Sequence, residues 1–162
     1  MLSTTLLEDE RPNERFERFY SETARSMVRF SLLLTSDTQT AEDITQDAYV
    51  EVYRRFAHLE NPKAYLRRCI INAVRRRAMR ERLSRRSIER LDTRGSAVDQ
   101  PAELCDVFAG LSLRQRTAVF LRYYLDLSEA DMATTMGCRP GTVKSTLSSA
   151  LSLMREALDG PD

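Results

Sequence analysis

Hydrophobic side chains recur at three- and four-residue steps along most of the chain, which is the pattern of amphipathic helices. The first run begins near Pro12 and passes through Phe16, Met27 and Leu34 before the polar segment 35–38 interrupts it. Proline is well suited to the first turn of a helix, because it has no backbone N–H to lose there. We therefore predict a helix over this run and a break after it.

Two more periodic runs follow. A helix is predicted from about Thr40 to Phe56, with an inward face made of Ile44, Ala48 and Val52. Residues 57–62 form a loop, in which Asn61-Pro62 is typical of a helix cap and first turn. The next helix runs from Lys63 to about Arg82, and two inward faces fit its pattern: Leu66, Ile70 and Val74, or Cys69 and Ala73.

The periodicity ends after Leu83. Residues 84–101 are polar, contain Gly95 and Pro101, and are typical of an interdomain linker. Helical periodicity resumes in four segments, at 102–109, 112–124, 128–136 and 139–158. The predicted fold is all-α, with two small helical domains at 12–83 and 102–158, a flexible linker, a disordered N-terminus at 1–11 and a tail at 159–162.

Charge is segregated along the chain, although the net charge is only +1. The segment Asp37–Glu51 has five acidic residues and no basic one, whereas Lys63–Arg94 has twelve basic residues and three acidic ones. The acidic and basic stretches suggest two different partners, and the basic stretch suits the phosphates of a nucleic acid. A solvated charged face is the alternative explanation of such a run.

The cysteine and histidine content argues against a metalloenzyme. Cys69, Cys105 and Cys138 lie far apart, and His58 is the single histidine, so neither a disulfide framework nor a metal-ligand spacing is present. We predict no catalytic residues, no metal and no cofactor. The first residues lack the basic and apolar regions of a signal peptide, and no segment has the roughly 18 apolar residues of a membrane span. The expected location is the cytoplasm, without membrane association.

The strongest motif lies near the C-terminus, where Ala133, Gly137 and Val143 have the spacing of a helix-turn-helix. Glycine at the turn can adopt the left-handed conformation that ends the first helix. The second helix would enter the major groove of DNA with its early residues. Its exposed side is predicted to carry Arg139, Thr142, Lys144, Ser145 and Ser148. An ordinary helical hairpin without a DNA role is the alternative.

One face of the predicted helix 40–56 is acidic. Asp43, Gln46, Asp47 and Glu51 lie at three- and four-residue steps and therefore share an exposed face. A helical di-metal site would need histidines beside such carboxylates, and the chain lacks them. A solvated face and a docking face for a basic protein partner both fit the pattern, and the second is the sharper hypothesis.

The predicted helix 63–82 is rich in arginine, and arginine fits phosphates whereas asparagine can recognise a base edge. Aromatic and polar residues of the preceding loop lie where an unpaired base could stack. The residues suggested for nucleic-acid contact are Phe56, His58, Asn61, Lys63, Tyr65, Arg68, Asn72, Arg75 and Arg76.

Together these segments resemble the extracytoplasmic-function (ECF) group of sigma-70 factors, of the sigma-E-like type found in actinobacteria. The segment Ala41-Glu-Asp-Ile-Thr-Gln-Asp-Ala48 is similar to the family's region 2.2, which docks on the β′ clamp helices of core RNA polymerase. The resemblance implies that Asp43, Gln46 and Asp47 are polymerase contacts. Asn61–Asn72 is similar to regions 2.3 and 2.4, which open and recognise the promoter −10 element.

The resemblance extends to the C-terminal helices. Leu111–Tyr124 and Gly141–Ser145 are similar to region 4, which recognises the −35 element and contacts the polymerase β flap. The implied −10 contacts are Lys63, Arg68, Asn72, Arg75 and Arg76, with a flipped-base pocket at 56–61. The implied partners are core polymerase and promoter DNA, and the family leaves open whether an anti-sigma factor also binds.

Two features depart from the family pattern. Tyr65 stands where tryptophan is usual, so strand opening is expected to depend more on the promoter sequence. The recognition helix of the family usually carries basic residues, often arginines, where this chain has Thr146, Ser148, Ser149 and Ser152. Each missing phosphate contact lowers the salt-sensitive part of DNA affinity, so isolated −35 binding is expected to be weak.

The sequence thus predicts a non-catalytic promoter-specificity subunit of RNA polymerase. A stand-alone helix-turn-helix regulator is the alternative. Such a regulator would normally bind duplex half-sites as a dimer. This alternative also gives no role to the acidic and basic helices. A nucleic-acid-processing enzyme would need a metal or a nucleophile–base pair, for which the sequence offers no spacing.

Overall fold

The computed structural model describes residues 12–85, 107–108 and 110–159. The predicted disordered N-terminus, most of the predicted linker 84–101 and the end of the tail lie outside these residues. The predicted helix 102–109 also lies outside them, apart from Val107 and Phe108, which are helical. All regular structure among the described residues is helical, which confirms the predicted fold class.

Three long helices and one short one form what we call the N-terminal unit: α1 (Pro12–Thr35), α2 (Thr38–Arg55), the 3₁₀ turn η1 (Phe56–His58) and α3 (Pro62–Arg85). Helix α3 continues three residues past its predicted end. Its inward face is the first of the two predicted sets, because Leu66, Ile70 and Val74 are buried.

Buried hydroxyl groups join α1 to α2. The Tyr49 hydroxyl and Thr23 Oγ1 are 2.7 Å apart, and the hydroxyls of Ser31 and Thr45 are also 2.7 Å apart. Burial raises the pKa of Tyr49 to about 12, so this phenol stays neutral. Buried hydrogen-bonded pairs of this kind fix the register of two helices, because an unpaired hydroxyl in the core would be costly.

Helices α5 (Leu113–Val119), η2 (Phe120–Tyr124), α6 (Glu129–Met136) and α7 (Pro140–Asp159) form what we call the C-terminal unit. The predicted single helix 112–124 widens into a π-helix over η2, where the Leu125 N–H donates to the Phe120 carbonyl at 3.2 Å. This widened turn stacks the rings of Phe120 and Tyr124, with centroids 4.5 Å apart. Ser112 begins α5 with a reciprocal capping box.

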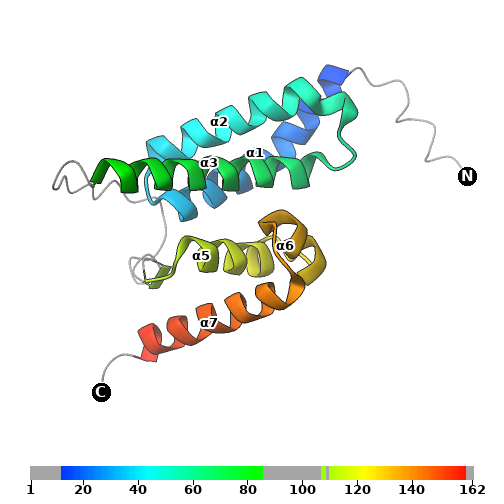
Figure 1. Cartoon of the computed structure of the whole chain (residues 1–162). Coiled ribbons are helices and arrows are strands. Elements are labelled where there is room, and N and C mark those ends of the chain that lie inside the picture. The colour runs from blue at the N-terminus through cyan, green and yellow to red at the C-terminus, as the bar shows by residue number, and fades with distance from the viewer. Residues whose placement is uncertain (1–11, 86–106, 109, 160–162) are drawn as a thin grey trace, which may run out of the picture.

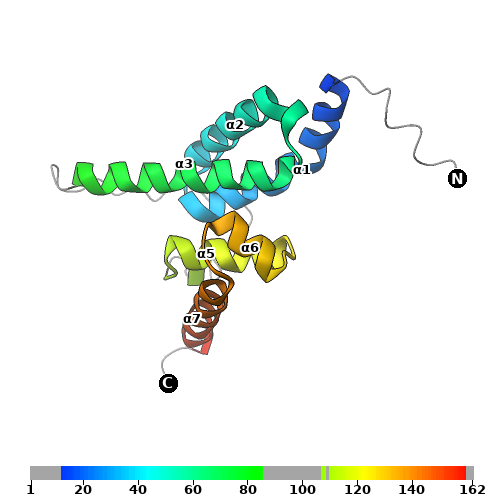
Figure 2. The same ribbon diagram turned by 45° about the vertical axis from the view of Figure 1, so that its right-hand side comes forward.

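The two units contact each other in the structure. Figures 1 and 2 show α5 and α6 between the N-terminal unit and α7, which lies on the far side. Helix α5 contacts α1, and α6 contacts α3. One apolar cluster runs from Phe30 of α1 through Phe120 and Met132 of the C-terminal unit. The core is therefore continuous between the two units.

Candidate nucleic-acid interface

The acidic face of α2 is exposed, as predicted from its spacing. Asp43, Gln46 and Asp47 are exposed, whereas Ile44, Ala48 and Val52 on the other side are buried. The side chain of Asp43 accepts one hydrogen bond within its own helix, from the Gln39 amide at 3.1 Å. Most of the polar groups on this face therefore point toward solvent, where a binding partner could reach them.

Val50 lies on the same face and was not predicted as a site residue. It is 49% exposed, and Tyr53 one turn further along α2 is 51% exposed. An exposed aliphatic side chain ringed by polar residues is a common composition for a protein-binding surface. The period-3.6 pattern could have located Val50, because it continues the row of Asp43 and Asp47.

Glu51, predicted to belong to the same face, has partners within the N-terminal unit. Its carboxylate accepts from Arg55 Nε at 2.7 Å and from the Tyr65 hydroxyl at 3.3 Å. The second bond links α2 to α3. Glu51 therefore helps to hold α2 against α3, a structural role that Asp43, Gln46 and Asp47 do not share.

A groove of about 470 Å³ lies between α2 and α3, and we call it the α2–α3 groove. It has an acidic wall on α2, with Asp47 and Glu51, and a basic wall on α3. The remaining lining residues are Ile44, Ala48, Tyr65, Arg68, Cys69, Asn72, Ala73 and Arg76. Residues that the sequence assigned to two different partners thus lie on one surface.

The floor of the groove is less polar than its walls. Ala48 and Ala73 line it together with the Cys69 thiol, whose pKa burial raises above its usual value. Desolvation likewise raises the pKa of Tyr65, so its hydroxyl remains a donor toward Glu51. An apolar floor between hydrogen-bonding walls suits a planar group with polar edges, such as a nucleobase.

The loop before α3 is only partly free for contact. The Asn61 side-chain oxygen accepts from the Ala64 N–H at 3.0 Å, which confirms the predicted cap. Phe56 packs edge-on against Phe16, with centroids 5.3 Å apart, and is only partly exposed. His58 and Lys63 are exposed. Asn61 is exposed too, but its side-chain oxygen is occupied by the cap, which leaves His58 and Lys63 for contact with a partner.

The basic side chains of α3 divide between two directions. Arg68, Asn72 and Arg76 line the α2–α3 groove and are exposed. Arg75 instead reaches the C-terminal unit, where its Nη2 donates to the Met136 carbonyl at 3.4 Å. The predicted −10 set is therefore not a single continuous surface in this structure, because Arg75 is separated from the rest.

Arg67 was grouped with the basic residues by sequence, but the structure buries it to 9% exposure. Burial lowers its pKa, and the nearby charge of Asp131 in α6 opposes that shift. Arg67 therefore faces α6 and not solvent. No local sequence pattern distinguishes it from its neighbour Arg68, since the burial comes from a helix more than 60 residues away.

The helix-turn-helix has the predicted construction. Gly137 has φ 64° and ψ 43°, the left-handed conformation that few residues adopt without strain. Ser128 caps α6 through its hydroxyl, which accepts from the Asp131 N–H at 3.1 Å. Ala133 and Val143 are buried where the two helices cross. The turn therefore places the start of α7 at the surface.

The predicted recognition residues of α7 lie on its accessible side. Arg139, Lys144, Ser145 and Ser148 are exposed, and Thr142 is half-buried. Lys144 Nζ lies 3.5 Å from Glu129 Oε2, and both side chains are largely exposed, so this ion pair is weak. The Ser145 hydroxyl donates to the Thr142 carbonyl at 3.1 Å. Arg139 and Lys144 are thus the two cations of this surface.

Neither a metal cluster nor a membrane helix occurs in the described parts of the chain. Within residues 12–85, 107–108 and 110–159 no group of three His, Cys, Asp or Glu side chains could hold a metal ion. Over those residues no helix is long and apolar enough to cross a membrane.

Two family profiles match the chain along these two surfaces. Residues 18–84 match "Sigma-70 region 2", and residues 103–154 match "Sigma-70, region 4". The first covers most of the N-terminal unit, including the acidic face and the groove. The second covers the helix-turn-helix.

Curated relatives match along nearly the whole chain. The RNA polymerase sigma-E factor of Streptomyces coelicolor is 32% identical over 155 residues, covering 91% of this chain and 88% of that protein. The sigma-E factor of Streptomyces avermitilis is 31% identical, with 91% and 87% covered. The ECF RNA polymerase sigma factor SigK of Mycobacterium tuberculosis is 26% identical, with 89% and 86% covered.

Solved structures share the fold. The sigma factor RpoE of Bartonella quintana, in complex with the anti-sigma factor NepR, superposes with a TM-score of 0.75 at 24% identity, covering 92% of this chain and 99% of that one. CnrH, in complex with the cytosolic domain of CnrY, superposes with a TM-score of 0.68 at 16% identity, covering 93% and 91%.

The chain belongs to the ECF group of sigma-70 RNA polymerase sigma factors. It directs promoter-specific transcription initiation as a non-catalytic subunit, and it binds core RNA polymerase and promoter DNA.

Proposed function

We propose that the α2 face docks on the β′ clamp helices of core polymerase while the adjoining α2–α3 groove and α3 bind the −10 element. The observation that carries this proposal is the shared groove, where Asp47 of α2 lies opposite Arg68 and Arg76 of α3. A subunit that presents single-stranded DNA to an enzyme has to hold both on adjacent surfaces. The groove supplies that adjacency within one rigid unit.

The docking surface is assigned to Asp43, Gln46, Asp47 and Val50. All four are exposed on one side of α2. Carboxylates steer a basic partner and fix its orientation, whereas a central aliphatic side chain contributes apolar contact. Glu51 is assigned a supporting role, because Arg55 and Tyr65 already occupy its carboxylate.

The −10 contacts are assigned first to Arg68, Asn72 and Arg76, which are exposed at the groove. An asparagine amide pairs with an adenine edge, and guanidinium groups hold the phosphates on either side. A flipped base would enter near the loop, with His58 and Lys63 as its accessible neighbours and Asn61 holding the start of α3. Phe56 and Tyr65 would support the pocket from below, since both are partly buried.

The −35 element is assigned to α7. Arg139 and Lys144 supply the cations, and Thr142, Ser145 and Ser148 the neutral polar contacts. Because two cations give few phosphate contacts, the affinity of this helix for duplex DNA is low and depends on polymerase to hold it in place. The C-terminal unit would contact the β flap at the same time.

The partners and the location follow from this assignment. Core polymerase and promoter DNA meet in the cytoplasm, which is where we place the protein. Two proteins of the same fold, the sigma factor RpoE and CnrH, were solved with partner proteins, and the partner of RpoE is an anti-sigma factor. They support extending the proposal to a regulatory partner of that kind, for which the exposed face of α2 is also available.

The experiment is a core-binding titration with single charge reversals on α2. Asp47→Arg is expected to weaken binding to core polymerase at least about tenfold, because it places a cation against a basic partner. Glu22→Arg is the matched control, since Glu22 is an exposed carboxylate on α1 and lies outside the α2 docking face. The double variant Asp43→Arg plus Asp47→Arg should abolish binding while far-ultraviolet circular dichroism stays unchanged. Equal affinity of Asp47→Arg and Glu22→Arg would refute the docking assignment.

A further inference from the structure

The two walls of the α2–α3 groove carry opposite charges that do not contact each other. Asp47 and Glu51 line the groove from α2, and Arg68 and Arg76 line it from α3. Among the described residues, neither carboxylate forms an ion pair with either of these arginines. The groove therefore has hydrogen-bond acceptors on one wall and donors on the other, and a ligand between the walls could bind both.

The balance of charge restricts the kind of ligand. Two carboxylates face two guanidinium groups, so one wall would repel a phosphate and the other would repel a metal ion. A neutral ligand with donors on one edge and acceptors on another edge satisfies both walls. The floor is formed by Ala48, Cys69 and Ala73, and its apolar character suits the face of a planar ring.

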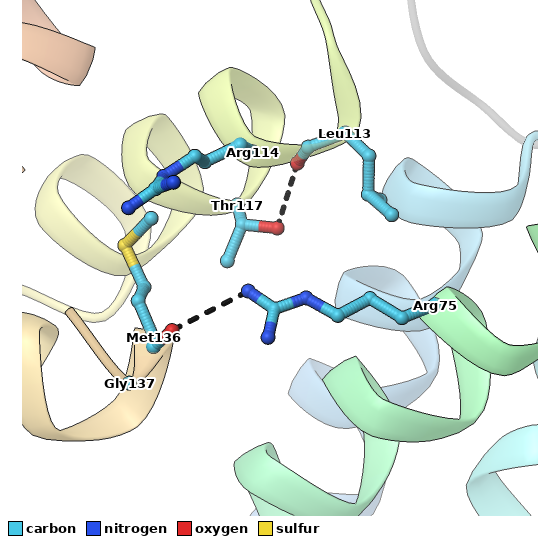
Figure 3. A pocket seen from close by; sticks show the side chains of 6 residues that line it. All are labelled: Arg75, Leu113, Arg114, Thr117, Met136 and Gly137. Carbon is cyan, nitrogen blue, oxygen red and sulfur yellow. Dashed lines mark hydrogen bonds between the residues drawn. The ribbon is translucent and has the colours of Figure 1, made fainter.

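A second cavity has a different charge pattern. Arg75 follows Asn72 by one turn of α3 but does not line the groove. Its guanidinium extends into a cavity of about 360 Å³ and donates to the Met136 carbonyl at 3.4 Å, as Figure 3 shows. Arg114 lines the same cavity, and no acidic residue of the described chain does. Of these two cavities, the α2–α3 groove alone combines an acceptor wall with a donor wall.

The Glu51 carboxylate is oriented by two hydrogen bonds and can accept more. Arg55 Nε and the Tyr65 hydroxyl donate to the same oxygen, Oε1, at 2.7 and 3.3 Å. The other oxygen, Oε2, has no hydrogen-bond partner within the described part of the chain. Because the two donors already fix the side chain, a ligand bound to Oε2 costs little further side-chain entropy.

Arg68 lies at the same end of the groove as Glu51. Burial is the main cause of the raised pKa of the Cys69 thiol, and Tyr65, Glu51 and Arg68 cause smaller shifts. These three side chains therefore lie around the thiol on the floor. Arg68 is exposed and has no ion-pair partner among the described residues, so its guanidinium keeps its donors for a ligand.

Among the four DNA bases, guanine is the one that matches both groups. Its N1–H and 2-amino group are adjacent donors, and its O6 and N7 are adjacent acceptors on the other side of the ring. A carboxylate can accept from the first pair. Arginine donates to the second pair in the commonest specific contact between arginine and a base. Adenine, cytosine and thymine each have a single donor group, so none of them supplies both pairs.

We propose that the end of the α2–α3 groove between Glu51 and Arg68 is a guanine-binding site. Glu51 accepts from N1–H and the 2-amino group, and Arg68 donates to O6 and N7. The inference rests on the proposed function for its first source of guanine, an unpaired base of the −10 strand. Asn72 lies one turn further along α3 and stays available for a neighbouring base. A free guanine nucleotide has the same edges, and the experiment separates the two sources.

Alkylation of Cys69 reports occupancy of this site in the natural chain. The probes are short single-stranded oligothymidylates with one central deoxyguanosine, deoxyadenosine or deoxycytidine, an all-thymidine strand, and guanosine 5′-monophosphate. Iodoacetamide labelling of each cysteine is measured by mass spectrometry. Cys138 is the internal control, because it is also half-buried but lies at the helix-turn-helix turn. The deoxyguanosine strand should protect Cys69 at a roughly tenfold lower concentration than the other strands, and Cys138 should be unaffected.

Base analogues assign the two edges of the base. Deoxyinosine lacks the 2-amino group and 7-deazadeoxyguanosine lacks N7, so each should bind the natural chain about threefold to tenfold more weakly than deoxyguanosine. Glu51→Gln keeps an oxygen for Arg55 and Tyr65 but presents an amide N–H to the base. Deoxyinosine and deoxyguanosine should then bind this variant equally, while 7-deazadeoxyguanosine still binds more weakly. Arg68→Ala should give the reverse pattern.

Glu22→Gln and Arg80→Ala are the matched controls. Both residues are exposed, and neither lines the groove. Both variants should keep the preference for deoxyguanosine, even if the loss of the Arg80 charge weakens the binding of every strand.

The outcomes separate the site from its source. Protection by the oligonucleotide alone identifies the DNA strand as the ligand, and equal protection by the nucleotide identifies a free nucleotide; both support the site. Equal protection by all strands, protection by none, or a guanine preference that survives both Glu51→Gln and Arg68→Ala overturns the inference. Failure of the −10 assignment would appear differently, as unchanged binding of every strand after Arg76→Ala.

Discussion

The two units present their candidate DNA surfaces in different ways. In the N-terminal unit, Arg68, Asn72 and Arg76 line a groove whose helices are joined by buried hydroxyl pairs. In the C-terminal unit, the start of the recognition helix presents two cations, Arg139 and Lys144, and the exposed serines that follow. Its position is set by the cap at Ser128 and by the turn at Gly137. This difference suggests that the −10 surface contributes more of the free energy of promoter binding. The −35 surface would mainly position the protein on the promoter.

The largest effect is expected in the groove. Replacing Asn72 and Arg76 together by alanine removes a base contact and a phosphate contact, which should lower open-complex formation roughly 100-fold. The measurement is run-off transcription from a cognate promoter with saturating core polymerase. Arg80→Ala is the control, because Arg80 is exposed on α3 but does not line the groove. A loss of the same size in the control would mean that charge alone, and not the groove, determines binding.

The second largest effect is expected on the stability of the N-terminal unit, at the buried Tyr49 hydroxyl that joins α2 to α1. The folded-state pKa of Tyr49 is raised to about 12, above its unfolded value of 10.0. The neutral phenol is therefore favoured by folding, so its contribution is full below pH 10 and is lost as the pH rises toward 12. The loss should be about 2 to 3 kcal/mol of unfolding free energy.

Tyr49→Phe is the comparison that isolates this group. It removes the titrating hydroxyl and the bond to Thr23, so the variant should be about 1 kcal/mol less stable at pH 7. Between pH 10 and 12 it should lose less stability than the unsubstituted chain. Urea unfolding at each pH, followed by circular dichroism, measures the difference. Parallel pH profiles would show that Tyr49 does not titrate with folding.

The smallest effect is a gain on α7. Ser148→Arg adds a cation to the exposed side of the recognition helix and should tighten binding to duplex −35 DNA roughly threefold to tenfold. The slope of log K against log salt should steepen by about 0.9, the value for one added phosphate contact. Ser148→Gln is the control, with added length but no charge. If both variants bind alike, side-chain length and not charge limits this surface.

Much of the fold was predictable because its determinants are local. One of the two inward faces predicted for α3 has four-residue steps, at Leu66, Ile70 and Val74, and all three are buried. Asn61 caps α3 and Gly137 takes the left-handed conformation that a helix-turn-helix needs. Each of these features depends on residues within a few positions in the chain, which is why the sequence pattern was sufficient.

The interface between the units was not predictable. Arg67 and Arg68 are adjacent and chemically identical, yet one is buried against α6 and the other is exposed at the groove. Arg75 and Arg76 are both exposed, yet Arg75 donates to the Met136 carbonyl of α6 whereas Arg76 lines the groove. The distinction comes from helices more than 60 residues away in the chain. The widened turn at Phe120 is a further example, because its stacking partners Phe30 and Tyr124 come from two different elements.

The central claim, that the −10 surface dominates promoter choice, has one direct measurement. Core polymerase and the purified protein transcribe a template library in which the −10 and −35 segments are randomised independently, and the transcripts are sequenced. We expect strong base preferences in the −10 segment and weaker ones at −35. Preferences of equal or greater strength at −35 would contradict it, and so would preferences at −10 that persist after Asn72 and Arg76 are replaced by alanine.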